Sequence, residues 1–384
     1  MPRGPTRRGV LGALALGPFA GCLESDPSAP REGSAGPDED GSDGDRDTPA
    51  PESETPEPTG GPPTADEAYH LPADPATLRE RAFETDVPMD GIPPIDDPVF
   101  TDREGLADAT LDLDGEDVVF GVEREGVAKA YPQRVLVYHE IVNDTLAGDP
   151  VAITYCPLTG TAQGFERGET TFGVSGWLLE SNLVMYDRET ESWWPQIYAT
   201  GLDDPFAGTS LEEFRVVWTT WGRWHEAYPE TRVMTAETGY ERRYHDDPYG
   251  GYNPPVGYYD YGGPMYEVTA EPDESLPLEA KTVVLGCRTG DGAVAFEKER
   301  LLEGEVLTAA IRGTEHVAVA EPDLETGYVY ANPEGRSVEP EGEGQYLIDG
   351  EAYAATALPL DRRLAFDAMW FAWYACYPDT EVRY

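Results

Sequence analysis

Two side chains that could serve as metal ligands lie in the first half of the sequence. Cys156 closes an apolar run and precedes a proline, and His139 begins the segment HEIVND. A thiolate and an imidazole are suited to copper, zinc or iron, and His245 and Asp187 could complete a coordination shell. The sequence contains no close ligand pair such as CxxC or HExxH, so this predicted metal site rests on residue types and not on spacing.

The same two residues allow a second hypothesis, a thiol-dependent enzyme or redox protein. Cys156 would be the nucleophile or redox centre and His139 the base, with Asp187 or Glu140 orienting the imidazole. The neighbours of the thiol are uncharged and the chain is acidic, so nothing nearby lowers the thiol pKa. A structural alternative stays open, in which Cys156 is an inert buried thiol and His139 a hydrogen-bonded core residue. On balance the sequence favours a protein that is not an enzyme.

A third set of residues suits ligand recognition. The set consists of Tyr155, Trp177, Asn182, Trp193, Trp194 and Gln196. Aromatic faces with a few polar groups are typical of grooves that bind a sugar, a peptide or a partner domain. The same tryptophans could instead fill the core of a β-sheet protein.

Five segments of the chain carry a family resemblance. They are DGIPPIDDPVF at 90–100, HEIVND at 139–144, YCPLTGTA at 155–162, SNLVMYDRETESWWPQ at 181–196 and DPYGGY at 247–252. In this order they resemble the DUF3179 family, which implies little chemistry because the family is named for an unknown function. Many members have a second cysteine where this chain has Thr159. That difference weakens a dithiol or a two-cysteine zinc centre.

The composition is strongly acidic. The chain has 74 Asp and Glu residues against 27 Lys and Arg, a formal net charge of -47. Such a charge repels nucleic acid and anionic surfaces, so we expect no nucleic-acid partner. The composition resembles that of haloarchaeal proteins, whose surface carboxylates hold water and cations at high salt. With 40% hydrophobic residues, the chain can still bury a sizeable core.

Residues 1–22 have the form of an export signal. Arg7 and Arg8 make a twin-arginine pattern, and the apolar run at 10–20 is too short to span a bilayer. The segment ends in FAGC, which resembles a lipobox and predicts a lipid on the thiol of Cys22. Residues 23–66, rich in Pro, Ser, Gly and acidic residues, predict a disordered tether. We therefore expect the protein at the cell surface, anchored by its lipid to the outer face of the cytoplasmic membrane.

An internal match predicts that the body is duplicated. The segment DVVFGVEREGVAKAY at 117–131 matches TVVLGCRTGDGAVAF at 282–296, and each is typical of a β-hairpin. A second pattern, WxxWxxxYPxTxV, begins at Trp221 and again at Trp370. Its steps of three and four place the aromatic residues on one face of a helix. We therefore predict an α+β fold with a β-rich body of two repeated halves, each mostly strands followed by a terminal aromatic-faced helix.

These patterns set the expected boundaries. An N-terminal extension of the body covers 67–110, the first repeat 111–235, a connector rich in Tyr, Gly and Pro 236–277, and the second repeat 278–384.

Features present in one half alone are the candidates for function. Cys156 aligns with Glu321, and His139 has no clear counterpart in the second half. Cys287 and Cys376 could form a disulfide or remain as buried thiols. The favoured function is non-catalytic binding outside the cytoplasm, at a site built by the first half and the connector.

Overall fold

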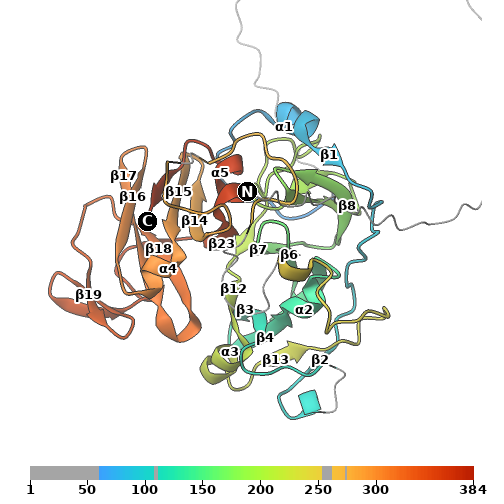
Figure 1. Ribbon diagram of the computed structural model, residues 1–384, viewed down its shortest axis with the longest axis horizontal. Helices are drawn as coiled ribbons and strands as arrows, with labels where there is room; N and C mark the ends of the chain where they lie inside the picture. Colours follow the sequence, from blue (N-terminus) through green and yellow to red (C-terminus); the bar gives the residue numbers. More distant parts are fainter. Residues whose placement is uncertain (1–59, 108–110, 253–261, 273–274) are drawn as a thin grey trace, which may run out of the picture. The chain divides into compact units, whose positions relative to one another are not determined.

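The structure is a computed structural model, and it describes residues 60–107, 111–252, 262–272 and 275–384 (Figure 1). The predicted signal at 1–22 and nearly all of the predicted tether lie outside these residues. Within them, strands predominate and the helices are short, which confirms the predicted β-rich α+β fold. None of the described helices has the length and apolar character required to cross a membrane.

The first half builds three sheets. The first contains, in order, β12 (Val217–Thr220), β3 (Val118–Arg124), β4 (Val127–Pro132), β13 (Arg232–Met234) and β2 (Phe100–Thr101). The second contains β11 (Glu213–Phe214), β7 (Thr161–Glu166), β6 (Asp149–Cys156) and β5 (Ile141–Leu146). The third contains β1 (Phe83–Glu84), β8 (Phe172–Leu179), β9 (Asn182–Asp187) and β10 (Trp193–Pro195).

The second half also builds three sheets. The first contains β23 (Ala365–Met369), β14 (Val283–Thr289), β15 (Gly292–Glu297) and β24 (Glu381–Arg383). The second contains β16 (Leu307–Ile311), β17 (Thr314–Glu321), β18 (Thr326–Ala331) and β22 (Asp361–Arg363). The third contains β19 (Glu339–Gly342), β20 (Gln345–Ile348) and β21 (Glu351–Ala354).

Short helices join these strands. The α-helices are α1 (Pro75–Arg81), α2 (Gln133–Leu136), α3 (Trp221–Ala227), α4 (Lys298–Leu302) and α5 (Trp370–Cys376). The 3-10 helices are η1 (Gly105–Ala107), η2 (Gly250–Tyr252) and η3 (Pro322–Leu324).

The leading sheets of the two halves have the same pairing. Both predicted hairpins form, as β3–β4 and β14–β15, which confirms them. In each sheet the first hairpin strand pairs antiparallel with the strand that precedes the aromatic helix. The second hairpin strand pairs parallel with the strand that follows that helix. We propose that the two halves are repeats, and this shared topology supports the proposal.

A glycine–tryptophan contact recurs in both halves. A Cβ on Gly121 would lie 2.3 Å from the Trp224 ring, and one on Gly286 would lie 2.2 Å from the Trp373 ring. Each indole N–H donates to a threonine hydroxyl seven residues later, at 2.9 Å from Trp224 and 3.1 Å from Trp373. Each helix can therefore pack directly on the hairpin backbone because the strand residue beneath its tryptophan lacks a side chain.

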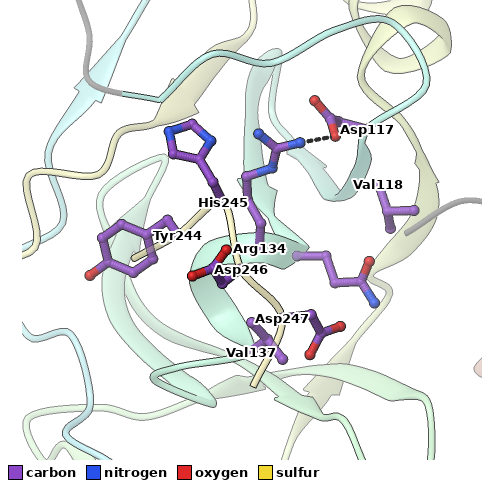
Figure 2. Close-up of a pocket in the computed structure, with 9 residues that line it drawn as sticks. Asp117, Val118, Arg134, Val137, Tyr244, His245, Asp246 and Asp247 are labelled. Carbon is purple, nitrogen blue, oxygen red and sulfur yellow. Dashed lines mark hydrogen bonds and ion pairs between the residues drawn. The ribbon is translucent and has the colours of Figure 1, made fainter. Parts of the chain in front are cut away.

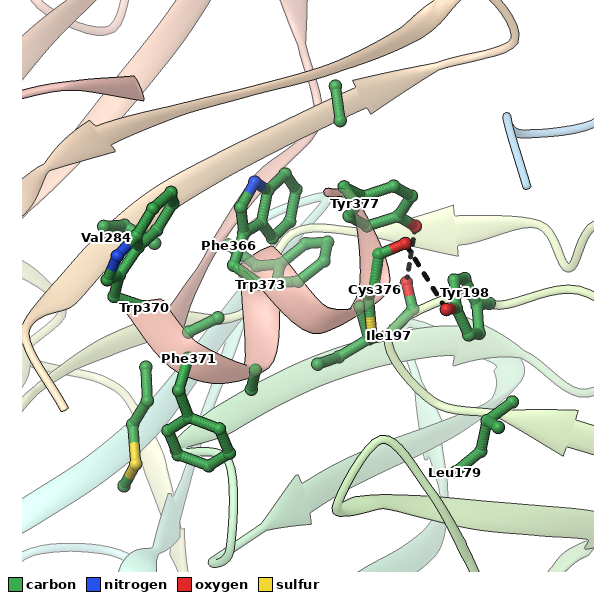
Figure 3. Packing of buried hydrophobic residues seen from close by; sticks show 14 of the residues in the cluster. Leu179, Ile197, Tyr198, Val284, Phe366, Trp370, Phe371, Trp373, Cys376 and Tyr377 are labelled. Carbon is green, nitrogen blue, oxygen red and sulfur yellow. Dashed lines mark hydrogen bonds between the residues drawn. The ribbon is translucent and has the colours of Figure 1, made fainter. Parts of the chain in front are cut away.

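One hydrophobic cluster contains residues of both halves. Leu179 and Tyr198 of the first half pack in it with residues of α5 from the second half. Figure 3 shows the Tyr198 hydroxyl donating to the main-chain oxygen of Cys376 at 3.3 Å, and the Tyr377 hydroxyl donating to that of Ile197 at 3.3 Å. The two halves therefore share part of one core.

The three cysteines within the described residues are all buried and free. Cys287 and Cys376 do not form a disulfide, so the alternative of two buried thiols is the one observed. Burial raises the pKa of the Cys287 thiol to about 12, so it stays protonated. Both residues act as small core side chains of the second half.

A substitution at Gly286 tests the glycine–tryptophan contact. Gly286→Ala would push a methyl group into the fully buried Trp373 ring, and we expect a loss of about 1–3 kcal/mol in the free energy of unfolding. Urea denaturation measures the loss. Gly115→Ala is the matched control, because the nearest heavy atom to its Cβ would lie 4.0 Å away. Equal stability of the two variants would contradict this packing.

Candidate functional site

The five segments that resemble the DUF3179 family meet in space. Side-chain hydrogen bonds join Asp96 to Asn143, Asp90 to Tyr186, Asn182 to Thr159, and Tyr252 to the main-chain oxygen of Leu158. Each bond links two of the segments, which are far apart in the sequence. The region around the end of β6 is therefore where the family's segments form one structure.

Three consecutive residues at this place, 138–140, hold a long connecting segment, and we call them the clamp. The segment they hold, residues 236–252, we call the strap. The Tyr138 hydroxyl lies 3.0 Å from the main-chain oxygen of Arg243 and 2.8 Å from that of Asp246. Nε2 of His139 lies 2.7 Å from the Tyr244 hydroxyl. Tyr138 of the clamp thus holds the backbone of the strap, and His139 holds one of its side chains.

Glu140 makes the third attachment. Its Oε1 lies 3.4 Å from the hydroxyl of Tyr249, which donates to it. The strap presents that tyrosine through a turn in which Asp247 Oδ1 accepts a hydrogen bond from the Tyr249 N–H at 2.8 Å. Glu140 is buried and its backbone is left-handed, with φ 57°. A buried residue with a side chain in this conformation is strained, and such strain concentrates at functional sites.

Burial keeps the clamp uncharged near neutral pH. It raises the pKa of Glu140 to about 8 and lowers that of His139 to about 4. Nδ1 of His139 lies 2.7 Å from the carbonyl oxygen of Pro93, which can only accept, so Nδ1 carries the proton. Nε2 therefore accepts from Tyr244, and both ring nitrogens are occupied. His139 is therefore a structural attachment between Pro93 and the strap.

Cys156 lies at the end of β6 as a buried thiol. Its side chain is buried, and Sγ lies 4.0 Å from the main-chain oxygen of Ser181. Burial, with a contribution from nearby Glu140, raises the pKa of the thiol to about 11. The hydrogen bonds of His139 go to Pro93 and Tyr244, so the imidazole is not placed as a base for this sulfur.

The four predicted metal ligands do not form a coordination shell. Asp187 accepts from the main chain and hydroxyl of Thr190, at 2.7 and 2.6 Å, and from Nε1 of Trp194 at 3.0 Å, so it organises the turn after β9. His245 is exposed on the strap, away from the buried Cys156. Across the described part of the chain, no group of three or more His, Cys, Asp or Glu side chains could hold a metal ion. We propose no metal site.

The amides predicted to bind a ligand instead bind each other. Nδ2 of Asn182 donates to Thr159 Oγ1 and to Gln196 Oε1, both at 3.0 Å. Gln196 in turn donates to Thr154 Oγ1 at 2.8 Å. Tyr155, from the same predicted set, is fully buried, and its hydroxyl accepts from Gln133 at 2.8 Å. This buried network supports the turn after Cys156 from within.

The predicted aromatic groove is closed by the chain itself. Trp194 is fully buried in the core. The rings of Trp177 and Trp193 lie 5.0 Å apart, and the guanidinium of Arg79, from α1, covers Trp193. Nε of Arg79 also lies 2.9 Å from a carboxylate oxygen of Asp203. A ligand groove at these tryptophans would require α1 to leave.

Two hollows flank the strap. The inner hollow has a volume of about 90 Å³ and is lined by Asp117, Val118, Gln133, Arg134, Val137, Tyr244, His245, Asp246 and Asp247. Figure 2 shows Arg134 lying between His245 and Asp117, with which it forms an ion pair. The outer hollow, of about 820 Å³, is lined by Tyr138, Ala236, Tyr240, Glu241, Arg242, Arg243, Tyr244, His245 and Asp246. Three strap residues line both hollows, so the strap is a wall shared between them.

The sequence carries one signal for the strap residues in its arginines. Arg242 and Arg243 are adjacent arginines in a chain with 74 acidic and 27 basic residues. Arg-Arg doublets also occur at 7–8 and 362–363, but this one lies just before the family segment DPYGGY. The connector was expected to contribute to the site through His245, whereas in the structure residues 240–246 line the outer hollow.

The clamp predicts a specific pH dependence of stability. The pKa of Glu140 rises from 4.5 to about 8 on folding, so its contribution to stability is lost as the pH rises through 8. The pKa of His139 falls from 6.5 to about 4, so its contribution is gained as the pH rises from 4 to 6.5. The two effects oppose each other below pH 6.5. From pH 6.5 to 8 the free energy of unfolding should fall by up to about 1.4 kcal/mol per pH unit.

Urea denaturation across that pH range measures the slope. Glu140→Gln, which cannot ionise, should lose the fall between pH 6.5 and 8. The control is Glu241→Gln on the exposed part of the strap, which should keep it. Parallel pH profiles for wild type and Glu140→Gln would show that this carboxyl is not the group responsible.

Comparison with known proteins gives one family. The family model described as protein of unknown function (DUF3179) matches residues 89–380. The match covers all five segments and both halves of the body. No match is found among curated proteins or among solved structures. The chain belongs to the DUF3179 family.

Proposed function

We propose that this protein is an extracytoplasmic binding protein whose ligand occupies the outer hollow beside the strap. The observation that carries the proposal is the attachment of the strap by three consecutive clamp residues. These attachments use main-chain oxygens, Tyr244 and Tyr249, so they position the strap without engaging the side chains of Arg242, Arg243 or His245. A fixed backbone with exposed polar side chains around a hollow is the arrangement that a preformed ligand site needs.

The chemistry of the site supports binding and not catalysis. The groups with strongly shifted pKa values, Glu140, His139 and Cys156, are buried behind the strap and do not line either hollow. The outer hollow presents aromatic rings, guanidinium groups, an imidazole and two carboxylates. Cys156 is protonated and enclosed, so a thiol-dependent reaction has no support from the geometry.

The proposed location rests on the sequence up to residue 66. The twin arginines Arg7 and Arg8, the lipobox cysteine Cys22 and the acidic segment at 23–66 support export and a lipid anchor on a tether. The net charge of -47 supports the proposal that the protein functions in concentrated salt. In this proposal the partner of the N-terminal region is the membrane, reached through the lipid, and the body stands off its outer face.

Filling the outer hollow tests the binding site. Thermal-shift measurements on the full chain would use a panel of neutral sugars, amino acids and organic acids. Ala236→Trp places an indole in the hollow, and we expect the affinity for each bound compound to fall at least tenfold. Ala352→Trp, on the exposed surface of β21, is the control and should bind normally. Binding that survives in an Ala236→Trp variant of normal melting temperature would place the site elsewhere.

Replacing Cys22 tests the lipid anchor. Cys22→Ala removes the thiol that the lipid would occupy, so the protein should move from the membrane fraction to the soluble fraction. Replacing Arg7 and Arg8 with lysine should leave the uncleaved precursor inside the cell. Fractionation followed by intact-mass analysis reads both results. A Cys22→Ala protein that stays in the membrane fraction would exclude this mode of attachment.

A further inference from the structure

We propose that the ligand of the outer hollow is a small organic carboxylate, held by Arg242 and Arg243 while its body packs on Tyr240. This inference rests on the proposed function, because it names the ligand class of the same site. The first observation is the charge around the outer hollow. A chain with 74 acidic and 27 basic residues places two adjacent, exposed arginines and a histidine around one hollow. The hollow is therefore far less negative than the rest of the protein.

Of these two arginines, Arg243 has an acidic partner, whereas the guanidinium of Arg242 is available to bind an anion. Arg243 lies 3.5 Å from Asp246, in an ion pair whose members are both exposed. Arg242 donates to the main-chain oxygen of its neighbour Glu241 at 3.2 Å. Within the described residues, Arg242 takes part in no ion pair. A guanidinium can bind a carboxylate through two parallel hydrogen bonds, and Arg242 retains the donors for that contact.

The acidic residues of the same hollow limit the charge of the ligand. Glu241 and Asp246 both line it and together balance the two arginines. A dianion such as phosphate would meet two fixed negative charges, whereas a single carboxylate can displace the weak, exposed pairing of Arg243 with Asp246. The site therefore suits a monoanion with one carboxylate group.

The aromatic residues of the hollow would contact the rest of the ligand. Tyr240 is one of the large exposed aromatic side chains, 43% exposed, and the Arg242 guanidinium carbon lies 5.9 Å from its ring centre. A ligand whose carboxylate meets Arg242 therefore has an aromatic face beside it. Tyr138 and Tyr244, fixed by the clamp, add further aromatic surface to the hollow. Such faces suit the flat or apolar side of a ring.

A short-range contact also suits concentrated salt. At about 1 M ionic strength the screening length is only about 3 Å, so long-range attraction to a charged patch is lost. A paired hydrogen bond between a guanidinium and a carboxylate acts by direct contact. Two arginines in the hollow can hold an anion there even when the general field of the protein is screened.

Calorimetric titration of the full chain with matched acids and amides tests the ligand class. The probes are glucuronate against glucuronamide and benzoate against benzamide, which differ in charge far more than in shape. At least one acid should bind, and at least tenfold more tightly than its amide. Arg242→Gln with Arg243→Gln should lower the affinity for the acid to that for the amide. The control Arg312→Gln, an exposed arginine of the second half, should bind like wild type.

The possible failures separate the two proposals. Amides that bind as tightly as their acids would overturn the carboxylate proposal, as would acid binding that survives in the double variant. If neither acid binds while neutral compounds bind and are lost in Ala236→Trp, the ligand class is wrong and the binding site stands. If acid binding is lost in the double variant but survives in Ala236→Trp, the arginines bind anions outside the hollow and the proposed pocket is wrong.

Discussion

The turn at His139 and Glu140 is the constraint on which the site depends. The turn leads from α2 into β5, and it brings three consecutive side chains to three different parts of the strap. The backbone of Glu140 is left-handed at this turn, a conformation that costs energy for a residue with a side chain. Two hydrogen bonds hold the turn in this strained form. His139 donates to the main-chain oxygen of Pro93, and the N–H of Tyr155 donates to the main-chain oxygen of Glu140.

The second half supports the turn that follows Cys156. The N–H of Met369, just before α5, donates to the main-chain oxygen of Thr159 at 2.9 Å. A buried ion pair between Arg288 and Glu213 adds a second link, at 3.0 Å. A buried pair of this kind contributes little net stability but penalises any other arrangement of the two halves, since separation would leave a charge without its partner. The second half thus contacts the turn after Cys156 and strand β11, and it lines neither hollow.

Local patterns in the sequence predicted part of the fold but not the contacts of the site. The two hairpins and the aromatic helices follow from periodicities that nearby residues determine. The spacing of the tryptophans could not show that Arg79, about a hundred residues before Trp193, covers that ring. The metal hypothesis required a free ring nitrogen on His139. Both ring nitrogens instead form hydrogen bonds, with Pro93 and Tyr244, which lie far away along the chain in opposite directions. Such partners leave no trace in the spacing of the residues themselves.

The shared core has a consequence for how the chain becomes folded during synthesis. Tyr198 and Leu179 pack on α5, which the ribosome makes long after them. The strands of the first half can pair as they emerge, yet one side of their core stays open to solvent until α5 arrives. Folding of the body is therefore completed after most of it has been translated. In the interval, a chaperone or the acidic charge of the chain itself must keep the exposed apolar side from aggregating.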